Sequence, residues 1–254
     1  SQFLPRKVED FPKPDVLGLF ALSVEATPFI EKLETPRRFR WESVKGVIGK
    51  LNGRYVTVLQ TGVGMQGARQ MVERVAPALS AKTKWVSAGF AGALSADLKR
   101  GDILMPSQVT DGTRTIAISQ HISAAAVEAT PYLHVGSLLT VDHVVTNPKE
   151  RAKLFAQHDS VACDMETAAI ALTLRQRQLS MTSVRIISDN VDDKIHKEIA
   201  SRVSQSRIAG KLGAATGALC TRPAAAQDVW KLRAQANRAA QRLAGFLNGV
   251  VEQL

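Results

Sequence analysis

The chain has 254 residues, with 45% hydrophobic and 22% charged residues, as in ordinary globular proteins. No apolar run approaches the roughly 20 residues of a membrane-spanning helix, and the polar, proline-containing start lacks a secretory signal pattern. The two cysteines, Cys163 and Cys220, have no metal-ligand spacing and are too few for a disulfide framework. These features exclude a membrane-spanning protein and predict a cytoplasmic one.

The formal net charge is +10, and much of the basic excess lies late in the chain. The late basic residues are Arg202, Arg207, Lys211, Arg222, Lys231, Arg233, Arg238 and Arg242. Aromatic residues make up only 5%, which argues against a stacking platform for single-stranded nucleic acid. We interpret the charge as a solvated basic face and expect no nucleic-acid partner. A weak contact between a basic C-terminal helix and a membrane surface is the alternative.

Strand and helix patterns alternate from the N-terminus onward. Residues 1–14 contain three prolines and predict an extended arm, and residues 15–254 are expected to form a single domain. Strands are expected at 16–22, 39–44, 47–51, 55–59, 84–87, 103–109, 135–140, 161–163 and 183–187. Helices are expected at 23–33 (with Ser23 as N-cap), 68–79, 148–157 and 165–177. This alternation predicts an α/β sheet that is covered on both faces.

The C-terminal segment has a clear helical period. Its apolar residues step by three and four positions: Val229, Leu232, Ala236, Ala239, Leu243, Phe246 and Val250. Such a stripe lies on one face of a helix. We therefore expect a long helix that docks on the core.

Residues Gly62 to Gly67 match the G-x-G-x-x-G pattern between an expected strand and an expected helix. A dinucleotide site also needs an acid at the end of the next strand to hold the ribose. That strand ends in Ser87-Ala88-Gly89, without an acid. A glycine turn whose amides face a small polar ligand is the preferred interpretation.

Two acidic stations stand out later in the chain. Asp164-Met165-Glu166 precedes a run of small apolar residues, and Asp189 ends the apolar run that begins at Arg185. An acid opening a helix and an acid closing a strand can meet at one edge of a sheet. Carboxylates placed there can orient a sugar and move a proton.

Four segments in this order carry a resemblance to a known family: Ala21 to Ala26, Thr61 to Gly64, Gly89 to Gly92 with Gly101-Asp102-Ile103, and Asp164 to Glu166 with Ile187-Ser188-Asp189. The chain resembles the purine nucleoside phosphorylase/uridine phosphorylase superfamily, and within it most of all the methylthioadenosine/S-adenosylhomocysteine nucleosidases. The resemblance implies a three-layer α/β/α fold around a twisted mixed sheet. It also implies cleavage of the N-glycosidic bond of a nucleoside.

The resemblance implies roles for individual residues. Glu25 matches the acid that activates the attacking water, and Asp189 matches the acid that gives a proton to purine N7, with Ser188 orienting it. Met165 and Glu166 match the pair at the ribose, where Glu166 is expected to accept hydrogen bonds from the sugar hydroxyls and, so bonded, to stay ionised. Phosphorylases carry an arginine phosphate ligand in the early loop, and this chain has none there, which favours hydrolysis.

The remaining expected substrate-binding residues are Gly64, Phe90, Ala91, Gly92, Val144 and Val145. Relatives often have an aromatic residue where Val144 and Val145 stand, and a small or hydroxyl residue where Phe90 stands. The base pocket is therefore expected to differ from theirs. The chain is also similar to the hopanoid-associated phosphorylases, whose substrate is a lipid-linked adenosine.

Together these features predict a nucleosidase that hydrolyses a purine nucleoside, such as methylthioadenosine or S-adenosylhomocysteine. A homodimer is expected, and neither a metal nor a cofactor is required by the chemistry. The alternatives are a nucleoside phosphorylase, including the hopanoid-associated type, and a nucleoside-binding protein without turnover.

Overall fold

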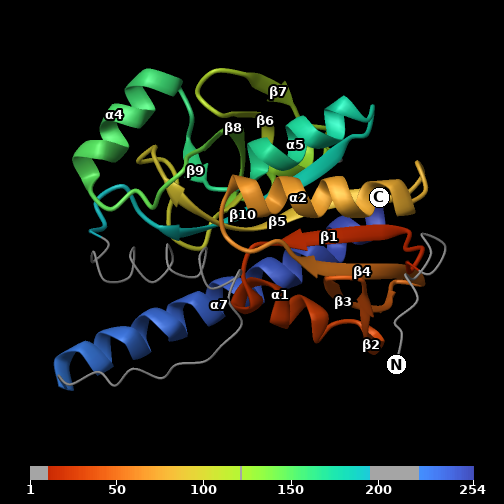
Figure 1. The fold of residues 1–254 in the computed structure, drawn as a ribbon. Coiled ribbons are helices and arrows are strands. Elements are labelled where there is room, and N and C mark those ends of the chain that lie inside the picture. Colours follow the sequence, from red (N-terminus) through yellow and green to blue (C-terminus); the bar gives the residue numbers. More distant parts are fainter. Residues whose placement is uncertain (1–10, 121, 195–222) are drawn as a thin grey trace.

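The computed structural model describes residues 11–120, 122–194 and 223–254, with the side chains of the last helix described from residue 234. Its strands belong to one ten-stranded sheet (Figure 1). The strands are β1 (Val16–Phe20), β2 (Glu34–Trp41), β3 (Val44–Leu51), β4 (Arg54–Gln60), β5 (Lys84–Ala93), β6 (Ile103–Thr110), β7 (Thr115–Ala117), β8 (Leu133–Thr140), β9 (Ala162–Asp164) and β10 (Met181–Asp189). The helices are α1 (Ser23–Ile30), α2 (Met65–Val75), α3 (Ala124–Glu128), α4 (Pro148–His158), α5 (Thr167–Gln176) and α7 (Pro223–Gln253), and a short 3₁₀ turn, η2 (Ala76–Ala78), follows α2.

The sheet is mixed and partly closed on itself. Its order is β10-β6-β8-β9-β5-β1-β4-β3-β2, and β10 also pairs with β5, so that β5, β9, β8, β6 and β10 form a closed circuit. The pairs of β1 with β4 and β5, and of β5 with β10, are parallel, whereas β5 pairs with β9 in antiparallel register. In this register Gly92 on β5 lies opposite Asp189 on one side and Cys163 on the other.

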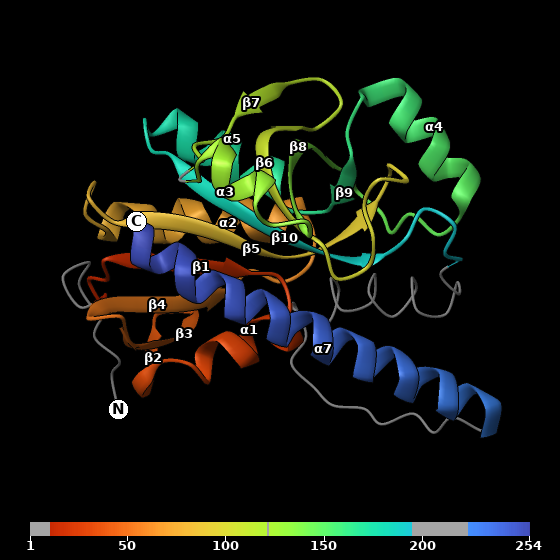
Figure 2. The same ribbon diagram turned by 180° about the vertical axis from the view of Figure 1, so that it is seen from behind.

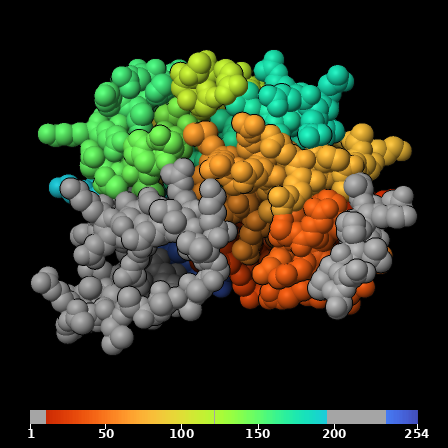
Figure 3. All heavy atoms as spheres, viewed as in Figure 1, coloured from red at the N-terminus to blue at the C-terminus, as the bar shows by residue number. Residues whose placement is uncertain are grey.

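Helices cover the sheet on both faces, which confirms the expected α/β class with a mixed sheet. One buried cluster combines apolar residues of α2 and α5 with the sheet, and a second combines those of α1 and α7 with it. Figure 2 shows α7 crossing in front of β1 and β5, on the face opposite α2. In the space-filling view, the atoms around α4 and those of β2 to β4 lie on opposite sides of the face shown (Figure 3).

The long C-terminal helix docks on the core, as its period predicts. Within the described side chains, the buried positions are Ala239, Ala240, Leu243, Ala244, Leu247, Val250 and Val251. Expected positions Val229 and Leu232 lie outside the described side chains, as do Lys231 and Arg233, and Cys220 and residues 202–222 lie outside the described residues. No helix within the described ranges is long and apolar enough to cross a membrane.

Several expected boundaries were wrong. Ser23 is not the N-cap of α1; Leu22 is, and its N–H is satisfied by the Glu25 carboxylate at 2.8 Å. Helix α2 begins at Met65, within the glycine motif, and α5 begins at Thr167. Strand β2 begins at Glu34, earlier than expected, because its exposed polar residues gave no apolar signal. The short β7 and α3 were not expected at all.

The described part of the N-terminal segment, from residue 11 onward, contacts the sheet. Phe11 is buried and makes edge-to-face contacts with Phe39 and Trp41, at centroid distances of 5.6 and 5.1 Å. Such pairs add to the stabilisation that apolar burial provides. Phe11 thereby fixes the point at which the chain enters β1.

Candidate active site

Glu25 lies where β1 gives way to α1. Its side chain is buried, and its two carboxyl oxygens accept hydrogen bonds from separate backbone groups: Oε2 from the Leu22 N–H at 2.8 Å and Oε1 from the Phe90 N–H at 2.9 Å. Burial raises the pKa of Glu25 above its ordinary value, against the lowering effect of these bonds and of Arg185. The carboxyl group is thus held rigidly and binds a proton more readily than an exposed glutamate.

Glu166 lies at the start of α5, next to the glycine loop. Its Oε1 accepts a hydrogen bond from the Gly64 N–H at 2.6 Å, and Gly64 adopts a positive φ of 97° that favours glycine. The loop amide therefore binds a carboxylate of the chain itself. Burial, followed by the nearby Asp164 charge, raises the pKa of Glu166 to about 8. The expectation that Glu166 stays ionised applies to the carboxylate bonded to sugar hydroxyls, and it remains a prediction.

Asp164 ties the first acidic station together. Its Oδ2 accepts from the N–H and hydroxyl of Thr167 at 3.1 and 2.5 Å, and its Oδ1 accepts from the Thr140 hydroxyl at 2.7 Å. The Thr140 hydroxyl in turn accepts from the Ala168 N–H at 2.9 Å. These bonds satisfy free N–H groups at the start of α5 and fix the position of Glu166.

Arg185 is a buried cation beside these carboxyl groups. Its Nη2 donates to the hydroxyls of Ser87 at 2.5 Å and Thr167 at 2.6 Å, and lies 3.4 Å from Asp164. Its charge lowers the pKa of both Glu25 and Glu166. Gly89 makes this packing possible, because a Cβ there would lie 2.6 Å from Arg185 Nη1 and 2.8 Å from Glu25 Oε1.

Asp189 ends β10, as expected, and is hydrogen-bonded on both oxygens. Its Oδ1 lies 2.5 Å from the Ser188 hydroxyl, which also lies 3.3 Å from the Ala91 carbonyl oxygen. Its Oδ2 accepts from Nη2 of the buried Arg151. Asp189 retains 17% exposure of its side chain, so it combines a fixed orientation with access from outside.

The structure brings most of the expected site residues to one edge of the closed circuit. Phe90 contacts Glu25, Gly64 contacts Glu166, and Ala91 contacts Ser188. Gly92 leaves room for Asp189, since a Cβ there would lie 2.7 Å from Oδ2. Val145 is buried, and its carbonyl oxygen accepts a hydrogen bond from Arg151. Val144, which precedes Val145, and Met165, which precedes Glu166, are half-buried.

Two functional candidates, Arg151 and Arg185, were missed from the sequence. Arg185 interrupts an apolar strand run, and a charge at such a position indicates a buried, paired group. Arg151 lies in a helix among Lys149, Glu150 and Lys153, where its pattern resembles a solvated face. Its 1% exposure could not be read from that pattern.

Cys163 and His143 have other roles. Burial, together with the Asp189 charge, raises the pKa of the Cys163 thiol to about 12, so it behaves as a buried apolar residue. His143 is exposed and lies 2.7 Å from Asp142 and 2.6 Å from Glu150, and these bonds raise its pKa. Among the described residues, no group of three or more His, Cys, Asp or Glu could hold a metal ion.

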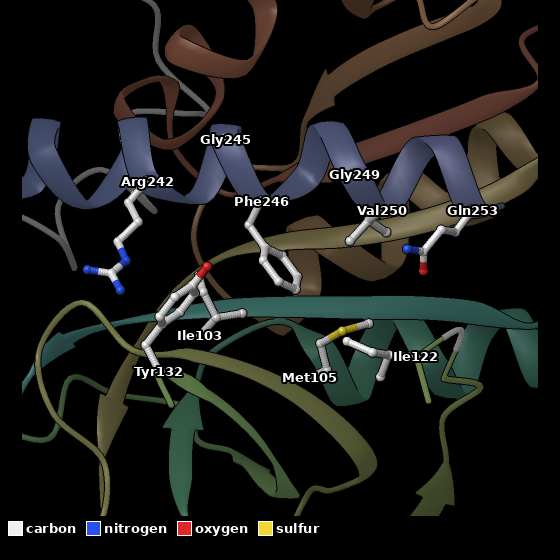
Figure 4. A pocket seen from close by; sticks show the side chains of 10 residues that line it. All are labelled: Ile103, Met105, Ile122, Tyr132, Arg242, Gly245, Phe246, Gly249, Val250 and Gln253. Atoms are coloured by element: carbon white, nitrogen blue, oxygen red, sulfur yellow. The ribbon is translucent and has the colours of Figure 1, made fainter. Parts of the chain in front are cut away.

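A cavity of about 500 Å³ lies elsewhere, between α7, strand β6 and the loop residues Ile122 and Tyr132 (Figure 4). It is lined by Ile103, Met105, Ile122, Tyr132, Arg242, Gly245, Phe246, Gly249, Val250 and Gln253. Arg242 is the one charged residue among these lining residues, and it stacks over the Tyr132 ring at 4.4 Å. The cavity therefore lacks the acid and base groups that the sheet edge has.

The family model of the phosphorylase superfamily matches residues 17–252. The chain belongs to the phosphorylase superfamily. The match covers the glycine loop, both acidic stations and the described part of α7. The family expected from the ordered motifs is thereby confirmed.

Curated relatives of this superfamily member include nucleosidases. The 5′-methylthioadenosine/S-adenosylhomocysteine nucleosidase of Shewanella sediminis is 25% identical over 201 residues, which cover 68% of this chain and 85% of the relative. The enzyme of the same name from Staphylococcus epidermidis is 27% identical over 200 residues, covering 68% and 86%.

Solved structures of the superfamily share the fold. A Helicobacter pylori methylthioadenosine nucleosidase variant with 5′-methylthioadenosine in its active site superposes with a TM-score of 0.70 at 18% identity, covering 96% of this chain and all of that one. Futalosine hydrolase of H. pylori superposes with a TM-score of 0.68 at 20% identity, covering 94% and 97%. The three-layer nucleosidase-type fold is confirmed.

Proposed function

We propose that the protein hydrolyses the N-glycosidic bond of a purine nucleoside, most of all a 5′-modified adenosine such as methylthioadenosine or S-adenosylhomocysteine. One observation carries the proposal: two buried carboxyl groups with raised pKa values, Glu25 and Glu166, lie at the same sheet edge as Asp189. The names of the curated relatives support the same chemistry.

Glu25 is the general base of the proposed reaction. Cleavage of the bond develops positive charge on the sugar, and a water attacks its anomeric carbon. A base works best when its pKa lies near the working pH, and burial moves Glu25 in that direction. Its hydrogen bonds to Leu22 and Phe90 fix the carboxyl plane relative to that water.

Glu166 is the proposed ribose ligand. Sugar hydroxyls that donate to its carboxyl group favour the ionised form, because hydrogen bonds to a charged group lower its pKa. A pKa of about 8 in the unliganded site leaves this ionisation to be driven by substrate binding. The charge formed there then stabilises the cationic sugar. Met165 lies beside it at the sugar, in the proposed pocket.

Asp189 is the proposed acid at the base side. The electron pair of the broken bond passes to the purine, and a proton from Asp189 to N7 neutralises that charge. Ser188 shares Oδ1 of Asp189, and Ala91 and Gly92 form the backbone beneath it. Gly64, Phe90, Val144 and Val145 complete the proposed substrate pocket.

Hydrolysis is favoured over phosphorolysis by the charges around Glu25. A phosphate anion near this carboxylate would be repelled, and the chain from Ala21 to Glu25 holds no arginine to bind it. The nearby Arg185 is buried, donates to the hydroxyls of Ser87 and Thr167 and lies 3.4 Å from Asp164, so its charge is already paired within the chain.

Product analysis tests the proposal. Purified protein is incubated with methylthioadenosine, S-adenosylhomocysteine, adenosine and inosine, with and without phosphate, and the sugar product is identified. Free sugar formed without phosphate supports hydrolysis. Sugar 1-phosphate would establish a phosphorylase, and binding of nucleosides without cleavage would establish a binding protein.

We further propose that residues 15–254 form one domain and that the protein is a cytoplasmic homodimer. Packing of α7 against α1 and β10 supports the single domain. Within the described side chains, a membrane-surface contact would have to use exposed residues such as Arg238, because the apolar stripe of α7 from Ala239 onward packs on the core. Sedimentation velocity tests the dimer: a species of one chain mass at micromolar concentration would contradict it.

A further inference from the structure

Arg151 is a buried cation to which the reaction proposed above assigns no role. It projects from α4, is 1% exposed, and donates to acceptors on three separate segments. Nη1 binds the Ala93 carbonyl oxygen of β5 at 2.9 Å, and Nη2 binds the Val145 carbonyl oxygen at 3.1 Å and Oδ2 of Asp189. One side chain therefore links the end of β5, the loop before α4 and the end of β10.

The hydrogen bonds to the two carboxyl oxygens of Asp189 determine which oxygen can carry a proton. A guanidinium group is always charged and has no acceptor, so Oδ2 must accept from Arg151. The other oxygen, Oδ1, lies 2.5 Å from the Ser188 hydroxyl. Gly92 lets this pair form, because a Cβ there would lie 2.7 Å from Asp189 Oδ2 and 2.8 Å from Arg151 Nη1. Only Oδ1 can carry the proton that a departing base receives.

We propose that Arg151 is the positioning residue for the base-side acid. It holds Oδ2 so that Oδ1, oriented by Ser188, faces the purine; this assignment rests on the proposed nucleosidase reaction. As the bond between C1′ and N9 breaks and its electron pair passes to the base, the Oδ1–H bond breaks and an N7–H bond forms. Water adds to C1′ and loses its proton to Glu25. Arg151 stabilises the carboxylate left on Asp189.

The competing role is a structural one. The bonds from Arg151 to Ala93 and Val145 also tie α4 to the sheet, so loss of activity alone would not separate the two roles. A substrate whose leaving group needs no proton does separate them. The nitrophenolate of p-nitrophenyl β-D-ribofuranoside leaves as a stable anion, so its release depends on Glu25 and Glu166 but not on Asp189.

The test compares both substrates in Arg151→Met and Arg151→Lys, after circular dichroism has shown that each variant is folded. Arg151→Met should lower kcat for methylthioadenosine by about 100-fold, the lower range for a lost acid catalyst. Turnover of the nitrophenyl riboside should stay within about threefold of the wild type. Arg151→Lys, which keeps the charge and a donor, should recover part of the loss. If Arg151→Met does not fold, the same two-substrate comparison is made with Arg151→Lys, for which a loss confined to methylthioadenosine is expected.

A double-mutant cycle adds a second readout. If Arg151 acts through Asp189, adding Arg151→Met to Asp189→Asn should lower kcat for methylthioadenosine no further. Equal losses for both substrates, or full additivity in the cycle, would overturn the assignment and leave Arg151 as a structural anchor.

Measuring adenine binding distinguishes a failure of the Arg151 assignment from a failure of the proposed nucleosidase function. Calorimetry should show adenine binding weakened about tenfold in Arg151→Met, the effect of one hydrogen bond to a charged group. If the wild type cleaves nothing but this tenfold change is found, the nucleosidase proposal fails, and Arg151 positions Asp189 for binding of the base rather than for catalysis. If the wild type cleaves methylthioadenosine and Arg151→Met behaves like the wild type, the positioning role fails alone. If the wild type neither cleaves methylthioadenosine nor binds adenine, both are overturned.

Discussion

The Glu166 carboxyl group couples the site to the stability of the fold. Its pKa is about 8 in the folded chain and near the ordinary 4.5 in the unfolded one. Between these values the folded state binds more protons than the unfolded state, so the free energy of unfolding falls as pH rises from about 5 to about 8 and levels off above that. Glu25, whose pKa is also raised, adds to the same trend.

Thermal unfolding between pH 5 and pH 9 measures this effect. Glu166→Gln cannot ionise, so its Tm should fall less over this range than that of the wild type. Glu73→Gln, on an exposed part of α2, is the matched control and should keep the wild-type slope. Equal slopes in Glu166→Gln and wild type would contradict the raised pKa.

A substitution at Gly92 tests the packing around the pair formed by Asp189 and Arg151. A Cβ at this position would lie 2.7 Å from Asp189 Oδ2 and 2.8 Å from Arg151 Nη1, both held by other bonds. Gly92→Ala should therefore displace the pair and lower kcat/KM for the nucleoside at least about tenfold, the scale of a misplaced catalytic group. Activity within twofold of the wild type would show that the pair can move freely.

Gly245→Ala is the matched control for that substitution. A Cβ at Gly245 would meet nothing within 4 Å, and the residue lies inside α7. Because alanine favours a helix over glycine, the free energy of unfolding should rise by about 0.5–1 kcal/mol without loss of activity.

At the scale of elements, α7 packs against both α1 and β10. Leu243 is fully buried in the cluster that it forms with α1 and the sheet. Leu243→Ala should lower the free energy of unfolding by about 2–5 kcal/mol, as for large-to-small changes in a packed core. Gln241→Ala, on the exposed face two residues away, should change it by less than about 0.5 kcal/mol. Urea unfolding measures both; equal effects would contradict the docked helix.

Elements with strong periodicity could be predicted from the sequence, and those formed by tertiary contacts could not. The steps of three and four residues around Leu243 predicted α7 because a docked helix needs such a stripe. The start of α1 at residue 23 was predicted, but its N-cap was not, because the Glu25 side chain binds the Leu22 N–H and no local sequence pattern indicates this bond. Strand β2 is mostly exposed and carried no apolar signal.

At the scale of the whole molecule, the sheet brings together acids that are far apart in sequence. Ordered motifs predicted Glu25, Glu166 and Asp189. Parallel pairing of β5 with β1 and β10 brings together the strands that lead to Glu25 and Asp189, and β9, which precedes Glu166, pairs with β5 in antiparallel register. The arginines were not predicted, because a buried cation is recognised by its partners rather than by its neighbours in sequence. Pairing of Arg151 with Asp189 depends on the side chain of Arg151 reaching from α4 to the ends of both β5 and β10.

Hydrolysis by a water that Glu25 activates is tested most directly by the rate of adenine release from methylthioadenosine in phosphate-free buffer. The wild type should release adenine without phosphate, and Glu25→Gln should lower kcat by about 10²–10⁴-fold, the range for a lost general base. Glu31→Gln, exposed at the end of the same helix, should match the wild type. Release that requires phosphate, or an active Glu25→Gln, would contradict the proposed mechanism.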